Sequence, residues 1–171
     1  MTNPNNATIT TVHTAAFTAG DALKIPTLRI LKDDGNLYEG ADKPTLDKET
    51  ALKMYDTMVF TRVLDERMLA AQRQGRISFY MQCLGEEATT VGSAAALDDQ
   101  DMIMAQYREQ GALRYRGFTL EQFMNQLFSN EKDLGKGRQM PVHYGSKDIY
   151  YMTISSPLGT QIPQASGYAY A

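Results

Sequence analysis

Residues 106–109 read Gln-Tyr-Arg-Glu, and residues 155–161 read Ser-Ser-Pro-Leu-Gly-Thr-Gln. Each stretch follows a short apolar run, residues 102–105 before the first and residues 150–154 before the second, and both runs have the pattern of a strand. Helical stripes alternate with such runs along the chain, which predicts an α/β fold with a mostly parallel sheet flanked by helices. Ligands commonly bind where the strands of such a sheet end, so the first stretch is a candidate site.

Three segments carry the signals of helices. The first begins near Asp47, which can cap it, and the second spans roughly residues 85–97. The third starts at Thr119, which forms a capping box with Gln122. Apolar residues recur on one face of the first and third helices, the pattern of amphipathic helices. They are Leu52, Tyr55, Met58, Val59 and Val63 in the first, and Leu120, Phe123, Met124, Leu127 and Phe128 in the third.

The composition changes near residue 46. Residues 1–46 lack a strong periodic pattern and predict an extended or flexible N-terminal arm, whereas residues 47–171 predict part of one domain. A helix rich in Ala and Gly follows Pro157 and reaches Ala171 without a glycine stop or a polar tail. We therefore expect the sequence to break off within this domain.

Charge and cysteine content exclude several classes of function. The net charge is −3 and the pI is near 5.4, whereas nucleic-acid binding would favour a basic surface. No run approaches the roughly 20 apolar residues of a membrane span. Cys83 is the only cysteine and the two histidines are far apart, which argues against a metal cluster. The first 22 residues contain no Arg or Lys, which argues against a mitochondrial presequence and favours a bacterial cytoplasmic protein.

Tyr107 and Arg108 form the first candidate binding pair. A guanidinium grips phosphate oxygens through two parallel donors, and a neighbouring phenol can donate one more hydrogen bond. The alternative is an ordinary salt bridge between Arg108 and a nearby carboxylate.

The second candidate site is built from uncharged oxygens. Ser155, Thr160 and Gln161 carry hydroxyl or amide oxygens, and Pro157 contributes a backbone carbonyl. Hard cations take oxygen ligands, and a set without carboxylates suits a monovalent ion. The alternative is a simple helix start at Ser156-Pro157. Nearby, His143 is either a proton shuttle or a packing residue, and Gly135-Lys136-Gly137 fits neither the dinucleotide-binding fingerprint nor the Walker pattern.

Taken together, residues 47–171 resemble the alpha subunits of the branched-chain 2-oxo acid dehydrogenases. The matching stretches are residues 72–80 (Gln-Arg-Gln-Gly-Arg-Ile-Ser-Phe-Tyr), 85–87 (Gly-Glu-Glu), 92–97 (Gly-Ser-Ala-Ala-Ala-Leu), 106–109, 133–145 (Asp-Leu-Gly-Lys-Gly-Arg-Gln-Met-Pro-Val-His-Tyr-Gly) and 154–158 (Ile-Ser-Ser-Pro-Leu). Pyruvate-specific relatives share the Tyr-Arg pair but differ at Arg-Ile-Ser-Phe-Tyr and Ser-Ser-Pro-Leu. The resemblance is therefore closer to the branched-chain members.

The resemblance implies the N-terminal part of a thiamine-diphosphate-binding fold, with roles for individual residues. Tyr107 and Arg108 would bind the diphosphate of the cofactor, while Ser156 and Leu158 would contact its rings. A potassium ion would be bound by Ser155, Pro157, Thr160 and Gln161. Phe79, Tyr80 and Gln106 would line the pocket for a branched substrate. The Gly-Asp-Gly motif that holds magnesium and the catalytic histidine would lie beyond Ala171, and Gly159 stands where many relatives have Ala.

The implied activity is the oxidative decarboxylation of branched-chain 2-oxo acids of the 3-methyl-2-oxobutanoate type, with acyl transfer to a lipoyl group. The implied partners are a beta subunit, in a heterotetramer of two alpha and two beta chains, and a lipoyl-bearing acyltransferase core. Two alternatives stay open: the pyruvate-specific relative, and a truncated segment without catalysis that only packs against partner subunits. We expect the 171-residue chain alone to be inactive.

Overall fold

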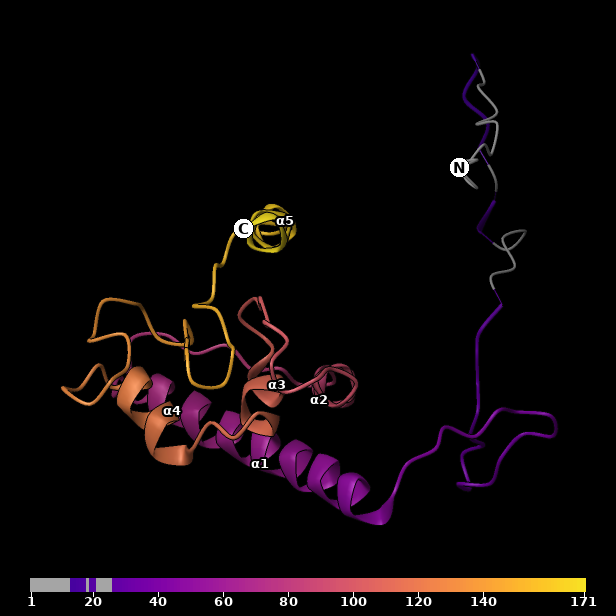
Figure 1. Cartoon of the computed structure of the whole chain (residues 1–171), viewed down its shortest axis with the longest axis horizontal. Helices are drawn as coiled ribbons and strands as arrows, with labels where there is room; N and C mark the ends of the chain where they lie inside the picture. The colour runs from indigo at the N-terminus through magenta and orange to yellow at the C-terminus, as the bar shows by residue number, and fades with distance from the viewer. Residues whose placement is uncertain (1–12, 18, 21–25) are drawn as a thin grey trace. The chain divides into compact units, whose positions relative to one another are not determined.

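A computed structural model describes residues 13–17, 19–20 and 26–171 (Figure 1). The chain divides into two units, Met1–Thr45 and Leu46–Ala171. In the described part of the first unit, an antiparallel bridge joins Leu31 and Leu37 across a turn. Gly35 occupies this turn with φ of 83°, a conformation that glycine adopts without steric cost. The second unit carries the candidate site.

Five helices lie in the described part of the second unit. They are α1 (Lys48–Arg73), α2 (Glu87–Ala95), α3 (Gln110–Tyr115), α4 (Leu120–Leu127) and α5 (Gln161–Tyr170). The predicted caps are confirmed: the Asp47 carboxylate accepts from Thr50 N at 2.9 Å, and the Thr119–Gln122 capping box is complete. Helices α2 and α3 pack against the long helix α1 and against each other (Figure 1).

The apolar stripe that the sequence shows along α1 lies on the exposed face of this helix. Its members Leu52, Tyr55, Val59 and Val63 are between 44% and 64% exposed. The buried face holds instead Thr57, Thr61, Leu64, Asp65 and Ala71. Helix α3 approaches α2 closely and also contacts this face of α1: a Cβ on Gly111 of α3 would lie 2.7 Å from Thr90 Oγ1 of α2 and 3.7 Å from Thr61 Oγ1 of α1.

The two threonines tolerate burial because their hydroxyls are satisfied within the helix. Thr57 Oγ1 donates to Lys53 O at 2.7 Å, and Thr61 Oγ1 donates to Thr57 O at 2.8 Å. A buried hydroxyl with a hydrogen-bond partner loses little free energy on leaving water. Hydrophobic periodicity could not detect this choice of face.

The predicted parallel sheet is represented by one pairing among the described residues. Ile103 and Tyr151 form a parallel bridge, in which Ile103 N donates to Tyr150 O at 2.8 Å and Met152 N donates to Ile103 O at 2.9 Å. Among the described residues there are isolated β-bridges, and no strand extends beyond a single bridge. The α/β class with a mostly parallel sheet therefore stays a prediction. The bridge matters here because it aligns residues 102–105 with residues 150–154, and both segments lead into the candidate site.

An aromatic cluster forms the centre of the core. Phe118, Phe123 and Tyr144 meet edge to face, with ring centroids 4.9–6.0 Å apart, and Phe60 of α1 packs on Phe123. Edge-to-face contacts of this kind are favourable beyond the area they bury. Tyr144 comes from the polar loop of residues 129–148, so this loop is anchored in the core next to His143.

Candidate functional site

The two stretches singled out in the sequence lie together in the structure. Gln106 Nε2 donates to Ser156 O at 2.8 Å, and Gln161 Nε2 donates to Ala105 O at 3.1 Å. These bonds cross the two segments just beyond the Ile103–Tyr151 bridge. Residues 105–109 and 155–161 therefore form one local surface, although 50 residues separate Gln106 from Ser156.

Arg108 is held by a backbone carbonyl rather than by a carboxylate. Its Nη1 donates to Gln82 O, and its guanidinium carbon lies 5.9 Å from the centre of the Tyr107 ring. Among the described residues, the salt bridges join Arg29 to Asp33, Arg62 to Glu87 and Lys132 to Glu121, and none involves Arg108. The alternative of a structural salt bridge is thus not observed in this part of the chain. A half-buried cation without a neighbouring anion is suited to bind an anionic ligand.

Glu109 fixes the conformation of the segment that carries the pair. Its carboxylate accepts from Gln106 N, and its carbonyl accepts from the Tyr151 hydroxyl at 3.4 Å. Burial raises the pKa of the Glu109 carboxyl, the hydrogen bond from Gln106 N opposes this, and the nearby Glu86 charge adds to the increase. Glu109 therefore acts within the loop and does not neutralise Arg108.

Uncharged oxygens converge at the start of α5. Thr160 Oγ1 lies 2.9 Å from Ser155 Oγ and 3.0 Å from Pro157 O. Gln161 is turned differently, because its Nε2 donates to both Ser155 O and Ala105 O. Within the described ranges, no group of three or more His, Cys, Asp or Glu side chains could hold a metal ion. Three predicted oxygen ligands are thus together, and Gln161 presents its amide nitrogen to this cluster.

His143 is a site residue that the sequence left open. Its Nδ1 lies 3.1 Å from Pro141 O, and its Nε2 contacts the Ser156 hydroxyl. A carbonyl can only accept, so in the neutral ring Nδ1 carries the hydrogen and Nε2 accepts from Ser156. The sequence signal was weak: a lone histidine in a polar loop, 13 residues before Ser156.

The turn before His143 is rigid. Val142 has φ of 67°, an uncommon conformation for a β-branched residue. Gln126 of α4 clamps this turn, accepting from Val142 N at 3.1 Å and donating to Met140 O at 2.8 Å. Strained backbone of this kind persists only where surrounding contacts hold it, and it is common at functional sites.

The remaining predicted residues differ in exposure. Leu158 is 81% exposed and Phe79 is half-buried. Tyr80 is buried, and its hydroxyl donates to Asp65 at 2.7 Å. Its place in a substrate pocket stays a prediction, and its hydroxyl already has a structural partner.

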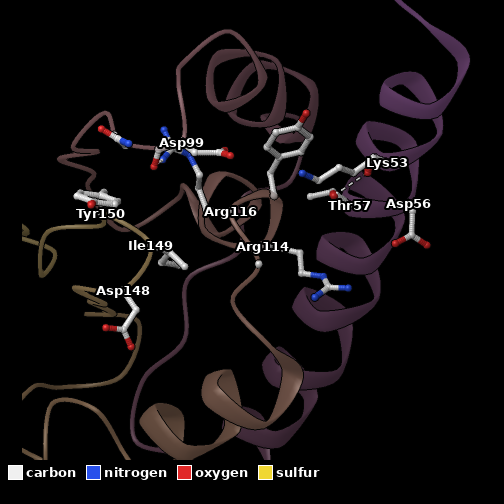
Figure 2. Close-up of a pocket in the computed structure, with 12 residues that line it drawn as sticks. Lys53, Asp56, Thr57, Asp99, Arg114, Arg116, Asp148, Ile149 and Tyr150 are labelled. Atoms are coloured by element: carbon white, nitrogen blue, oxygen red, sulfur yellow. Dashed lines mark hydrogen bonds between the residues drawn. The ribbon is translucent and has the colours of Figure 1, made fainter.

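A separate cavity holds none of the predicted site residues (Figure 2). It has a volume of about 570 Å³ and is lined by charged groups of both signs, among them Lys53, Asp56, Asp99, Arg114, Arg116 and Asp148. Arg116 donates to the carbonyls of Asp98 and Asp99, and Lys53 Nζ lies 4.1 Å from the centre of the Tyr115 ring. Its basic groups are therefore engaged by the protein itself, and we assign no chemistry to it.

Comparison with known proteins supports the resemblance predicted from the sequence. Residues 55–171 match the family described as the dehydrogenase E1 component. The chain is 51% identical to the mitochondrial 2-oxoisovalerate dehydrogenase subunit alpha of Caenorhabditis elegans, covering 92% of this chain and 38% of the relative. It is 54% identical to the mitochondrial alpha subunit of Homo sapiens (86% and 33%) and 51% identical to the mitochondrial subunit alpha 1 of Arabidopsis thaliana (86% and 31%).

The chain belongs to the dehydrogenase E1 component family, whose members depend on thiamine diphosphate. Within that family, its relatives are alpha subunits of 2-oxoisovalerate dehydrogenase, which confirms the expected resemblance. The chain spans about a third of the length of the curated relatives it matches.

The prediction of a bacterial cytoplasmic protein was wrong, because these relatives are mitochondrial subunits of eukaryotes. The prediction rested on the lack of early positive charge in residues 1–22. Such residues report on a presequence only where a chain begins at the start of the translated protein. In the described residues, no helix is both long enough and apolar enough to span a membrane.

Proposed function

We propose that this chain contributes to the alpha subunit of a thiamine-diphosphate-dependent dehydrogenase that decarboxylates branched-chain 2-oxo acids and transfers the acyl group to a lipoyl arm. The observation that carries the proposal is the guanidinium of Arg108, half-buried and without a carboxylate partner among the described residues. The names of these relatives support the substrate class, because they are 2-oxoisovalerate dehydrogenase subunits.

The donors around Arg108 fit the diphosphate of the cofactor. Arg108 uses one N–H for Gln82 O, so its other donors remain for phosphate oxygens, and the Tyr107 hydroxyl would add one more. Ser156 and Leu158 would contact the rings of the cofactor, and His143 would orient the Ser156 hydroxyl. When bound, thiamine diphosphate supplies the carbanion chemistry, and these residues supply binding and orientation.

The oxygen cluster at the start of α5 fits a monovalent cation. Ser155 Oγ, Pro157 O and Thr160 Oγ1 converge without a carboxylate, which suits potassium better than a divalent ion. Gln161 would have to offer its amide oxygen instead of the Nε2 that now faces Ser155 O. Magnesium ligands are not assigned to this chain, and no catalytic residue is proposed within it.

The proposed partners are a beta subunit, in an assembly of two alpha and two beta chains, and a lipoyl-bearing acyltransferase. The relatives are alpha subunits, which supports a multi-subunit enzyme. Phe79 and Gln106 remain candidates for the pocket of the branched substrate, together with Tyr80. One observation favours the alternative of a segment that only packs against partners: the exposed apolar stripe of α1.

Titration of the full-length alpha subunit, assembled with its beta subunit, with thiamine diphosphate and magnesium tests this function. Arg108→Ala should weaken cofactor binding by about 1.5–3 kcal/mol, because a charged hydrogen bond to phosphate is lost. Arg67→Ala, an exposed arginine on the outward face of α1, is the control and should leave the affinity unchanged. Unchanged affinity in Arg108→Ala would remove this residue from the site, and preference for pyruvate over 3-methyl-2-oxobutanoate would refute the substrate class.

The cation is tested separately. Thr160→Val should raise the potassium concentration needed for half-maximal activity, because one of the converging oxygens is lost. Thr153→Val, an exposed position shortly before the cluster, is the matched control. An unaltered potassium dependence in Thr160→Val would refute the site.

A further inference from the structure

Asp65 is a buried carboxylate that forms no ion pair with any of the residues that the structure describes. It lies on α1 with 0% of its surface exposed, and the nearby Arg62 pairs with Glu87 at 2.6 Å instead. Three donors satisfy Asp65: Tyr80 Oη at 2.7 Å on Oδ1, and Cys83 N at 2.7 Å with Cys83 Sγ at 3.2 Å on Oδ2. In the described part of the chain, hydrogen bonds alone compensate this charge.

These bonds hold the irregular segment of residues 80–83 at both of its ends. Tyr80 is attached at the start and Cys83 at the end, while the carbonyls of the two residues between them accept from Gln110 and Arg108. Met81 O accepts from Gln110 Nε2 at 2.8 Å, and Gln82 O accepts from Arg108 Nη1. The segment 80–83 therefore connects Asp65 on α1 to the residues around Arg108.

We propose that Asp65 is a positioning residue for Arg108: it fixes the segment 80–83, whose Gln82 carbonyl orients the guanidinium toward the diphosphate of the cofactor. The proposal rests on the proposed function, because it takes Arg108 as a diphosphate ligand. Asp65 itself is not among the groups that would contact the cofactor. It acts through Tyr80, Cys83 and the carbonyl of Gln82.

The chemistry of a carboxylate explains why Asp65 suits this task. Its two oxygens accept from donors at the two ends of the segment 80–83 at the same time. An asparagine would have to present its NH₂ group to one of these donors, because a carboxamide has only one oxygen. A buried charge is also a poor means of stabilisation, since an apolar replacement of similar volume is often as stable. The carboxylate instead fixes the geometry of the segment 80–83.

A double-mutant cycle in the full-length assembly with the beta subunit tests the proposal. Thiamine diphosphate affinity is measured calorimetrically, in the presence of magnesium, for Asp65→Asn, Arg108→Ala and the double variant. Asp65→Asn should weaken binding about tenfold when Arg108 is present, a typical size for coupled residues, and less than about twofold when Arg108 is absent. A residue with a merely structural role would produce the same loss in both backgrounds, and that result would overturn the proposal.

Two further variants complete the design. Tyr80→Phe removes one donor from the carboxylate and keeps the ring, so it tests the same coupling if Asp65→Asn fails to fold. It should weaken cofactor binding a few-fold with Arg108 present and leave it unchanged with Arg108→Ala. Thr57→Val is the control, because Thr57 is 3% exposed on the same helix and its hydroxyl bonds only to Lys53 O. If Arg108→Ala alone has no effect on affinity, the proposed function fails; if only the coupling is missing, the role of Asp65 fails.

Discussion

The Nε2 atom of His143 accepts from the hydroxyl of Ser156, and this contact joins the loop anchored by Tyr144 to the start of the 155–161 segment. The direction of the bond follows from the other ring nitrogen, which lies 3.1 Å from the Pro141 carbonyl. Gln126 and the left-handed Val142 hold the ring in place. Ser156 is therefore oriented by a buried, rigidly held imidazole.

His143→Leu should weaken thiamine diphosphate binding by about 1 kcal/mol, because the Ser156 hydroxyl loses a net hydrogen bond. His143→Gln should retain part of the affinity, since its amide oxygen can accept from Ser156. The affinities are measured by titration of the full-length assembly. Equal losses in both variants would show that the imidazole acts only by filling space.

A leucine-to-alanine substitution should reduce the stability of the protein by different amounts on the two faces of α1. Leu64→Ala, at a buried position, should destabilise the protein by about 2–5 kcal/mol through the cavity it leaves. Leu52→Ala, on the exposed face, should cost no more than about 0.5 kcal/mol. Chemical unfolding of the full-length protein measures both. A greater loss at Leu52 than at Leu64 would contradict the orientation of the helix.

Structural features that depend on neighbouring residues could be predicted from the sequence. Features that depend on contacts between distant residues could not. The Asp47 cap and the Thr119–Gln122 capping box are local, and both were predicted correctly. The buried face of α1 was not predicted, because it depends on the helices α2 and α3 that pack against it, and these come from distant parts of the sequence. Composition alone cannot show that a threonine hydroxyl is satisfied within its own helix.

The candidate site shows the same division. Tyr107 and Arg108 could be named as a phosphate-binding pair from their chemistry, and their assignment as cofactor ligands stays a prediction. The partners that orient them could not be named. The contact from Gln106 to Ser156 spans 50 residues, and that from Arg108 to the Gln82 carbonyl spans 26. Sequence analysis also cannot identify a backbone carbonyl as a hydrogen-bond partner, because every residue carries a backbone carbonyl.

The ion pair between Arg62 and Glu87 predicts a pH dependence of stability. Burial alone would raise the pKa of the Glu87 carboxyl, but backbone hydrogen bonds and Arg62 outweigh it and hold the pKa below 4.5. A carboxyl whose pKa is lower in the folded state stabilises the fold above its unfolded pKa, and this contribution disappears as the pH falls through the folded value.

Glu87→Gln should therefore destabilise the full-length protein by about 0.5–1 kcal/mol near neutral pH, a modest value because Arg62 is partly exposed. The difference from the unmodified protein should shrink as the pH falls below about 4.5, where the unfolded carboxyl becomes protonated. Chemical unfolding at several pH values measures this. A difference that grows on acidification would contradict the assigned pair.

Two glycine-to-alanine substitutions, one in α3 and one in α2, test the close contact between these helices. A methyl group on Gly111 would lie 2.7 Å from Thr90 Oγ1 and 3.1 Å from Val91 Cγ2, so Gly111→Ala should cost about 1–3 kcal/mol through overpacking. Gly92 of α2 has nothing within 4 Å of the same position, so Gly92→Ala should be neutral or stabilising, by up to about 1 kcal/mol from helix propensity. Gly111 also directly follows Gln110, whose side chain donates to the Met81 carbonyl in the segment 80–83 near Arg108. Gly111→Ala should therefore weaken cofactor binding as well, whereas Gly92→Ala should not, and calorimetric titration alongside chemical unfolding would measure both effects. If the Gly111→Ala variant were as stable as the unmodified protein, α3 would not pack on α2 as closely as described. This packing would then not help to position Arg108.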